Sequence, residues 1–253
     1  EEPIGATIYA DNKFLAIMVL VLKFIFYNFA DKIIAISNKS EKSLKKIVFF
    51  NNKIVLILNP YVEKILKIKR IKKTKNKKFI ILSTGRFTHQ KNFFALIDAF
   101  TNLSKKYNKI ELNIIGKGNQ EKLMIKKTQY IRNIKIISWK KNIGNHFLKS
   151  DLFILNSFYE GLPNALIDAV NYEIPCISTD VSGARDILIN GKGGYIVPIN
   201  NQHKLEKKIK YVMENYPEAK RKARYAKSRI KRFGKINLLF FYKTFLKLVN
   251  YKK

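Results

Sequence analysis

Two carboxylates, Glu160 and Asp168, lie eight positions apart in the segment SFYEGLPNALID at residues 157–168. The apolar run before it, residues 151–156, is typical of a short buried strand. A strand, a turn that carries an acid and then a helix N-terminus is an arrangement in which α/β proteins hold phosphorylated ligands. A buried turn followed by a capped helix has the same spacing, so the segment alone leaves both interpretations open.

The helix after this turn is predicted to span residues 163–171. Pro163 suits its first position, where the missing N–H costs nothing. Asn164 suits a local helix cap better than a ligand group. Glu160 therefore lies before the predicted helix start, and Asp168 lies inside the helix.

Two cations, Arg86 and Lys91, follow another apolar run, the strand predicted at 79–83. Gly85 between them and the strand permits a tight turn. An arginine can bind a phosphate through two parallel hydrogen bonds, and a lysine adds a point charge. Because the chain has 50 basic residues, a solvated pair of cations is the alternative.

Glycines follow two further predicted strands, Gly116 after residues 110–115 and Gly183 after residues 174–177. In a parallel sheet these turns lie at one edge, and ligands bind beyond the carboxyl ends of the strands. Cations suit a diphosphate, and acids suit sugar hydroxyls. Together these turns indicate a nucleotide-sugar site.

The wider pattern alternates short apolar runs with amphipathic stretches, which predicts a parallel sheet with helices on both faces, an α/β fold. The predicted strands are 79–83, 110–115, 134–137, 151–155, 174–177 and 194–197. The predicted helices are 91–106, 119–128, 142–149, 163–171, 182–189, 201–215, 217–232 and 235–249.

The first 60 residues are less regular. Residues 14–29 are the most apolar run, but Lys23 interrupts it and it is shorter than the roughly 20 residues of a spanning helix. We expect a helix buried in a core or lying in a membrane interface. Strands are predicted at 32–36 and 53–58, on either side of a helix over 38–47 capped by Ser37.

The charge balance is extreme, with a formal net charge of +32 over 253 residues. A nucleic-acid binder, a protein on an anionic membrane surface and a lysine-rich composition would each produce it. The lysines are spread along the chain without a nucleic-acid-binding motif, so we expect an anionic membrane surface together with a lysine-rich composition, and no nucleic acid. The single cysteine, Cys176, excludes an intrachain disulfide, and the three histidines lack metal-ligand spacing.

Several motifs occur in an order that resembles family 4 glycosyltransferases, retaining enzymes of the GT-B fold. They are GRFTHQKN (85–92), IIGKGNQ (114–120), SDLFILNSFYEGLPNALIDAV (150–170), PCISTDVSGARDIL (175–188) and GGYIVP (193–198). The resemblance implies an incomplete N-terminal, acceptor-side Rossmann-like domain at 1–60, a linker at 61–78 and a nucleotide-sugar-binding Rossmann-like domain at 79–216. Helices at 217–253 would return toward the N-terminal domain.

The same resemblance implies the roles of the site residues. Glu160, Arg86 and Lys91 would be catalytic, with Glu160 near the transferred sugar and the two cations on the diphosphate. Asp168, in place of the family's second glutamate, would bind the ribose, and the backbone near 140–143, after Trp139, would approach the base. The full donor-binding set would be Gly85, Arg86, Lys91, Gly116, Glu160, Gly161, Leu162, Pro163, Asn164 and Asp168.

The resemblance thus implies a hexosyltransferase that moves a sugar, with a UDP-sugar the expected donor, to a glycan or polyprenyl-linked acceptor in cell-surface polysaccharide, lipopolysaccharide or glycoprotein glycan synthesis. It needs no cofactor or metal. We expect it to be cytoplasmic and peripheral on the inner face of the cell membrane. The alternatives are a catalytically incomplete fragment that binds nucleotide-sugar, a basic nucleic-acid-binding protein, or another GT-B enzyme.

Overall fold

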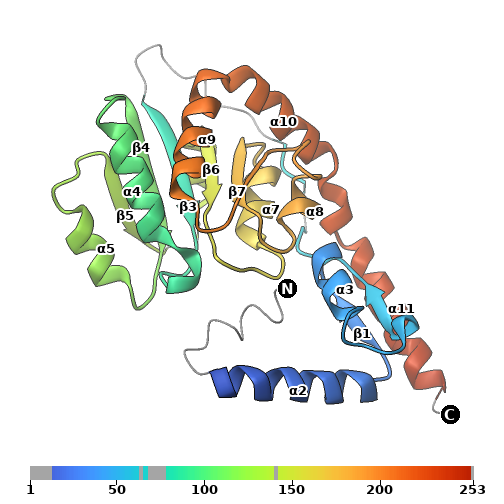
Figure 1. Ribbon diagram of the computed structural model, residues 1–253. Coiled ribbons are helices and arrows are strands. Elements are labelled where there is room, and N and C mark those ends of the chain that lie inside the picture. The colour runs from blue at the N-terminus through green and yellow to red at the C-terminus, as the bar shows by residue number, and fades with distance from the viewer. Residues whose placement is uncertain (1–12, 63–64, 68–77, 140–141, 252–253) are drawn as a thin grey trace.

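Six parallel strands form the main sheet of the chain, in the order β5-β4-β3-β6-β7-β8 (Figure 1). The computed structural model describes residues 13–62, 65–67, 78–139 and 142–251. The strands are β3 (Phe79–Thr84), β4 (Ile110–Gly116), β5 (Ile134–Ser138), β6 (Leu152–Leu155), β7 (Cys176–Thr179) and β8 (Tyr195–Val197). The strand order reverses between β3 and β6, which are adjacent. In such sheets the reversal opens a crevice at the carboxyl ends of the two strands.

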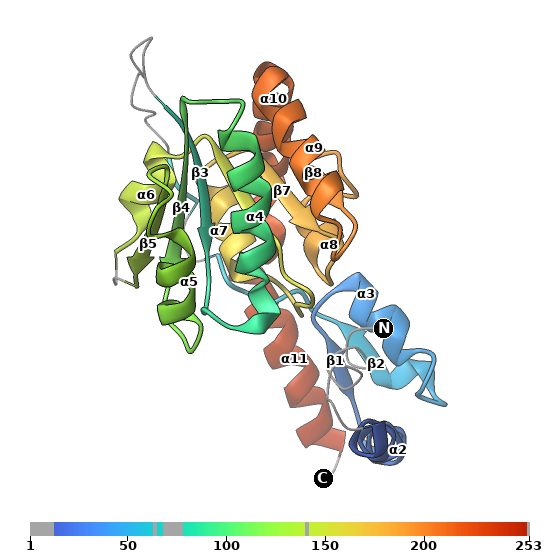
Figure 2. The same cartoon turned by 60° about the vertical axis from the view of Figure 1, so that its left-hand side comes forward.

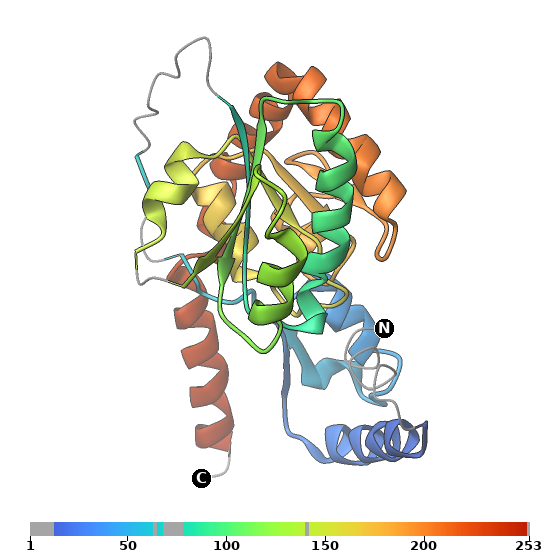
Figure 3. The same cartoon turned by 90° about the vertical axis from the view of Figure 1, so that its left-hand side faces the viewer.

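Helices cover both faces of this sheet, as the alternating pattern predicts (Figures 2 and 3). One face packs against α4 (Phe93–Ser104), α5 (Glu121–Thr128) and α9 (Gln202–Glu214). The other packs against α6 (Gly144–Lys149), α7 (Asn164–Asn171), α8 (Ala184–Ile187) and the 3₁₀ helix η3 (Ile230–Phe233). Because both faces are covered, every residue of β4 and β6 is buried. This explains the continuous apolar run of β6, whereas β4 also buries Asn113 and Glu111, which pairs with Lys78 and Lys135. The predicted α/β fold is confirmed.

A smaller unit precedes this sheet. Its strands β1 (Ile33–Ala35) and β2 (Ile54–Leu56) are parallel, and α3 (Asn38–Leu44) connects them. Ser37 caps α3 as predicted, accepting a hydrogen bond from the Ser40 N–H in a reciprocal capping box. The unit is attached to the main sheet by a buried hydrogen bond of 2.7 Å between the Ser37 and Ser182 hydroxyls.

Two long helices extend to the same end of the molecule as the smaller unit (Figures 1 and 2). They are α2 (Lys13–Phe29) and α11 (Ile236–Tyr251), which follows α10 (Tyr216–Ser228) and η3. Both expose large apolar side chains, among them Ile17 and Phe26 of α2. No helix in the described ranges has the length and apolar character that a membrane span requires.

The predicted elements are confirmed, with shifts at several ends that have local causes. The helix predicted at 91–106 begins at Phe93, because Asn92 adopts a left-handed conformation (φ 49°) and separates α4 from the 3₁₀ turn η2 (His89–Lys91). The strand predicted at 174–177 spans Cys176–Thr179, after Pro175. The domain division stays a prediction, and residues 63–64 and 68–77 of the predicted linker lie outside the described residues.

Candidate active site

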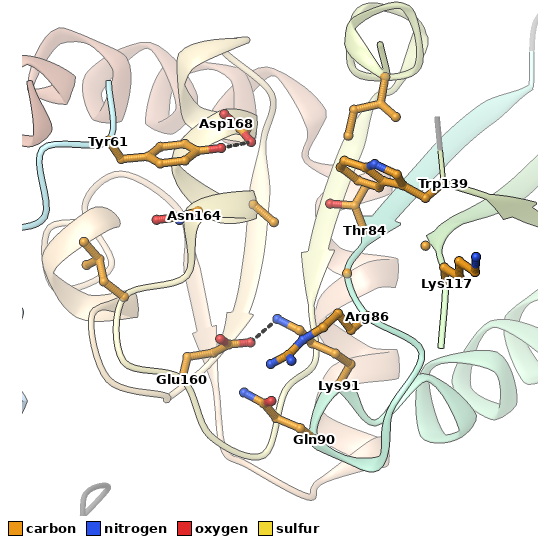
Figure 4. Close-up of a pocket in the computed structure, with 15 residues that line it drawn as sticks. Tyr61, Thr84, Arg86, Gln90, Lys91, Lys117, Trp139, Glu160, Asn164 and Asp168 are labelled. Atoms are coloured by element: carbon orange, nitrogen blue, oxygen red, sulfur yellow. Dashed lines mark hydrogen bonds and ion pairs between the residues drawn. The ribbon is translucent and has the colours of Figure 1, made fainter. Parts of the chain in front are cut away.

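A cavity of about 570 Å³ lies at the carboxyl ends of β3, β4, β5 and β6, where the strand order reverses (Figure 4). Most of the predicted site residues line it: Gly85, Arg86, Lys91, Gly116, Glu160, Leu162, Asn164 and Asp168. Figure 4 shows them in two groups, with Arg86, Lys91 and Glu160 at one end and Asp168 at the other. The cavity thus has two cations and Glu160 at one end and a separate carboxylate, Asp168, at the other.

The two glycines of the cavity allow the turns after β3 and β4 to touch. A Cβ atom on Gly116 would lie 1.9 Å from the carbonyl oxygen of Gly85 and 2.6 Å from the ring of Phe87. No side chain fits there, and Gly85 itself has a φ of 157°. The two predicted glycine-rich turns therefore contact each other and together form part of the cavity wall.

Lys91 and Glu160 form an ion pair across the cavity (Figure 4). Their side chains are only 13% and 11% exposed, so little solvent screens the pair. Ser157 also donates a hydrogen bond of 2.6 Å to the same oxygen, Oε1 of Glu160. Within the described residues no bond reaches Oε2, so this oxygen remains available to a ligand.

The turn that carries Lys91 is joined to the turn that carries Glu160. The Phe158 N–H donates to the Gln90 carbonyl at 2.8 Å, and the Gln90 side-chain amide donates to the Tyr159 carbonyl at 2.8 Å. The rings of His89 and Phe158 stack at 4.9 Å between centroids. These contacts hold Lys91 and Glu160 in register although 69 positions separate them.

Arg86 differs from Lys91 because its guanidinium is exposed. It makes no ion pair or side-chain hydrogen bond with any residue that the structure describes. Arg86 lines the cavity, so its N–H donors are available to a ligand there. An unpaired arginine beside a buried ion pair favours the binding of an anionic ligand.

Asp168 lies on α7 at the other end of the cavity and accepts a hydrogen bond of 2.8 Å from the Tyr61 hydroxyl at Oδ2. Burial raises the pKa of Asp168 from 3.8 to about 6, and the hydrogen bond from Tyr61 opposes that rise. Its other oxygen, Oδ1, has no hydrogen-bond partner among the described residues. Asp168 can therefore accept hydrogen bonds from a ligand hydroxyl when it is ionised.

The start of α7 differs from the prediction. Pro163 occupies the N-cap position, Asn164 is the first helical residue, and no side chain caps the helix. The Asn164 side chain faces the cavity instead. Gly161 and Pro163 do not line the cavity; Gly161 lies near the smaller unit, where an added Cβ would be 3.1 Å from Ile36.

The turn after β7, which carries Gly183, was expected to contribute to the same ligand site as the other turns. In the structure Gly183 does not line the cavity. Gly183 lies behind the cavity wall, where an added Cβ would be 2.7 Å from Leu162 and 2.9 Å from the Gly161 carbonyl oxygen. Its φ of 73° suits glycine. Gly183 therefore supports the Glu160 turn from behind and does not contact a ligand in the cavity.

Sequence reasoning missed several lining residues: Tyr61, Thr84, Gln90, Lys117 and Ala165. Thr84 and Lys117 are next to Gly85 and Gly116 in the sequence, so their positions at strand ends could have identified them as site residues. Tyr61 had no such signal, because it lies 107 positions before Asp168. Trp139 and Ile143, which flank the predicted base-binding backbone, do line the cavity; residues 140–141 between them lie outside the described residues.

Comparisons with known proteins identify the family of this chain. The family model of glycosyl transferases group 1 matches residues 64–229. An uncharacterised glycosyltransferase of Methanocaldococcus jannaschii is 30% identical over 192 residues, which cover 71% of this chain and 47% of that protein. The UDP-Gal:α-D-GlcNAc-diphosphoundecaprenol α-1,3-galactosyltransferase of Escherichia coli is 28% identical over 145 residues, which cover 55% of this chain and 36% of that protein.

The fold also matches a solved structure, Anabaena HepE in complex with UDP and glucose. The TM-score is 0.72 at 14% identity, with 92% of this chain and 67% of that chain covered. The chain spans less than half the length of the two curated relatives. With a family model that matches well over half of its residues, the chain belongs to the group 1 glycosyl transferases.

Proposed function

We propose that the cavity binds a UDP-sugar and that the protein transfers the hexose, with retention of configuration, to a hydroxyl of a glycan or lipid-linked acceptor. The observation that carries this proposal is the unpaired Arg86 guanidinium in one cavity with the free Oδ1 of Asp168. Such a cavity offers donors to a diphosphate at one end and an acceptor to ribose hydroxyls at the other. We place the enzyme in family 4 on the motifs described above.

In the proposed reaction the bond between the sugar C1 and the diphosphate oxygen breaks, and its electron pair remains on the nucleoside diphosphate. The acceptor oxygen bonds to C1, and its proton leaves with the diphosphate. Arg86 and Lys91 would stabilise the negative charge that develops on the leaving group. Glu160 would face the sugar through Oε2. Because Arg86 and Lys91 would supply the positive charge at the diphosphate, the proposal requires no metal ion.

Trp139 lines the cavity and is 54% exposed, which leaves an aromatic face open for a nucleobase to stack on. The proposal that this base is uridine rests on a relative. The Escherichia coli relative is named for a UDP-linked donor and a diphosphoundecaprenol acceptor. A polyprenyl-diphosphate-linked sugar is accordingly the acceptor class that we propose, in the synthesis of a cell-surface polysaccharide, lipopolysaccharide or glycoprotein glycan.

Titration calorimetry with UDP, GDP and ADP tests the donor site. We expect UDP to bind selectively and the Arg86→Ala variant to bind it about tenfold or more weakly, because a diphosphate loses its two-pronged contact. Arg132→Ala, which removes an exposed arginine outside the cavity, is the matched control. A folded protein that binds no nucleotide contradicts the proposal. Selective UDP binding without sugar transfer supports the alternative of a donor-binding module.

We also propose a peripheral position on the cytoplasmic face of the cell membrane. The support is the exposed apolar surface of α2 together with the net charge of +32. We expect the protein to sediment with phosphatidylglycerol vesicles at low salt, and the double substitution Ile17→Asp and Phe26→Asp to weaken this binding. Tyr130→Asp changes an exposed aromatic residue elsewhere and serves as the control. No binding to anionic vesicles at low salt would refute the membrane position.

A further inference from the structure

Tyr61 occupies a cavity wall although it comes from the segment that leaves the smaller unit. Its neighbour Val62 is buried, and the Val62 N–H donates to the Phe233 carbonyl at 2.8 Å. Val62 also forms an isolated parallel bridge with Gly234. The backbone next to Tyr61 is thus anchored where η3 ends, and the hydroxyl at the far end of the ring is held by its bond to Asp168.

The Tyr61 hydroxyl reaches the one carboxylate at its end of the cavity (Figure 4). It donates to Oδ2 of Asp168 at 2.8 Å, which uses its only proton. The phenolic oxygen keeps two lone pairs, and Oδ1 of Asp168 keeps its own. The pair therefore presents two neighbouring hydrogen-bond acceptors, which suit the two adjacent hydroxyl groups of a vicinal diol.

Burial of Tyr61 helps to keep its phenol protonated, so that the hydroxyl donates to Asp168. The hydroxyl of Tyr61 is partly desolvated, and both burial and the charge of Asp168 hold the pKa of Tyr61 well above its usual value, so the phenol keeps its proton. A proton fixed on the phenol directs the hydrogen bond toward Asp168. Because Tyr61 and Asp168 both line the cavity, the phenolic oxygen and Oδ1 are both placed to accept hydrogen bonds from a ligand there.

We propose that Tyr61 is a donor-specificity residue: its hydroxyl positions Asp168 and, with the free Oδ1, binds the 2′- and 3′-hydroxyls of the donor ribose. This rests on the proposed function, since it requires the nucleoside at this end of the cavity. It also makes Tyr61, which follows the smaller unit in the chain, part of the donor site.

The test is calorimetry on the full chain with UDP and 2′-deoxy-UDP, for the native protein and Tyr61→Phe. We expect the native protein to prefer UDP by about tenfold, since the deoxy ligand leaves a buried acceptor unpaired. Tyr61→Phe should weaken UDP binding about tenfold and 2′-deoxy-UDP binding much less, so that the preference falls toward one. Tyr107→Phe removes an equivalent bond of 3.0 Å to Glu214, away from the cavity, and should change neither affinity.

The outcomes separate the two proposals. If the native protein binds UDP selectively and Tyr61→Phe keeps the preference for UDP over 2′-deoxy-UDP, the role of Tyr61 is refuted and the donor site stands. Tighter UDP binding by Tyr61→Phe would show that the phenol competes with the ribose for Asp168, which also overturns the inference. If the native protein binds neither nucleotide, both proposals fail together.

Discussion

Lys91→Ala is expected to lower kcat/KM for sugar transfer by about 10³-fold and the free energy of unfolding by about 3 kcal/mol. The kinetic loss follows from removing a cation that faces the leaving diphosphate in a shielded cavity. The loss of stability follows because Glu160, only 11% exposed, would keep its charge without its partner. UDP release from a panel of UDP-hexoses with a polyprenyl-diphosphate-linked acceptor measures the first effect. Urea unfolding measures the second.

Two controls separate charge, stability and catalysis in this experiment. Lys105→Ala removes one exposed positive charge after α4, and it should leave both quantities unchanged. The double variant Lys91→Met with Glu160→Gln replaces the pair with neutral groups of similar size, so it should recover most of the stability and none of the activity. Recovery of activity in the double variant would show that the ion pair has only a structural role.

Asp168→Asn is expected to stabilise the fold and to weaken the donor complex. The pKa of Asp168 is raised from 3.8 to about 6, mainly by burial, so folding disfavours its ionised form. A difference of about two pKa units corresponds to roughly 3 kcal/mol of lost stability at pH 7. Asparagine carries no charge and removes that penalty. It is also a poorer acceptor for ribose hydroxyls, so UDP binding should weaken about tenfold or more.

The difference in stability between the native protein and Asp168→Asn is expected to depend on pH. Below about pH 4 the carboxyl is protonated in both the folded and the unfolded chain, so the native protein and Asp168→Asn should be equally stable. Between pH 4 and 6 the native protein loses stability relative to the variant, and above pH 6 the difference is constant. UDP affinity of the native protein should fall as the pH drops through 6. Tyr61 acts on Asp168 through its hydrogen bond, and burial together with the charge of Asp168 raises the pKa values of Tyr61 and Tyr172.

Urea unfolding of the two proteins from pH 4 to 8 checks this prediction, and Asp98→Asn is its control. Asp98 is exposed on α4 and pairs with Lys127, so its replacement should change stability little at any pH. A native protein that is as stable as Asp168→Asn at pH 7 would show that Asp168 is not destabilised by burial.

Local patterns in the sequence predicted most of the fold. Continuous apolar runs of four residues begin β3 and make up β6, because strands covered on both faces need no polar side. β4 was identified from a largely apolar segment that also contains Glu111 and Asn113. Glycines and polar residues directly after these runs located the functional edge of the sheet. Both signals are local: each depends on residues within one element and the turn that follows it.

Contacts between distant segments decided how the site residues are paired and buried. The ion pair of Lys91 with Glu160 joins turns 69 positions apart, and the bond of Tyr61 to Asp168 spans 107 positions. Their existence depends on the strand order, which places β3 beside β6 and returns the segment at Tyr61 across α7. The sequence by itself determined which residues carry acid, base and glycine chemistry at the strand ends. Only the tertiary structure decided which of them are paired, buried or left open to a ligand, because burial and pairing depend on neighbours that the chain brings together only when it folds.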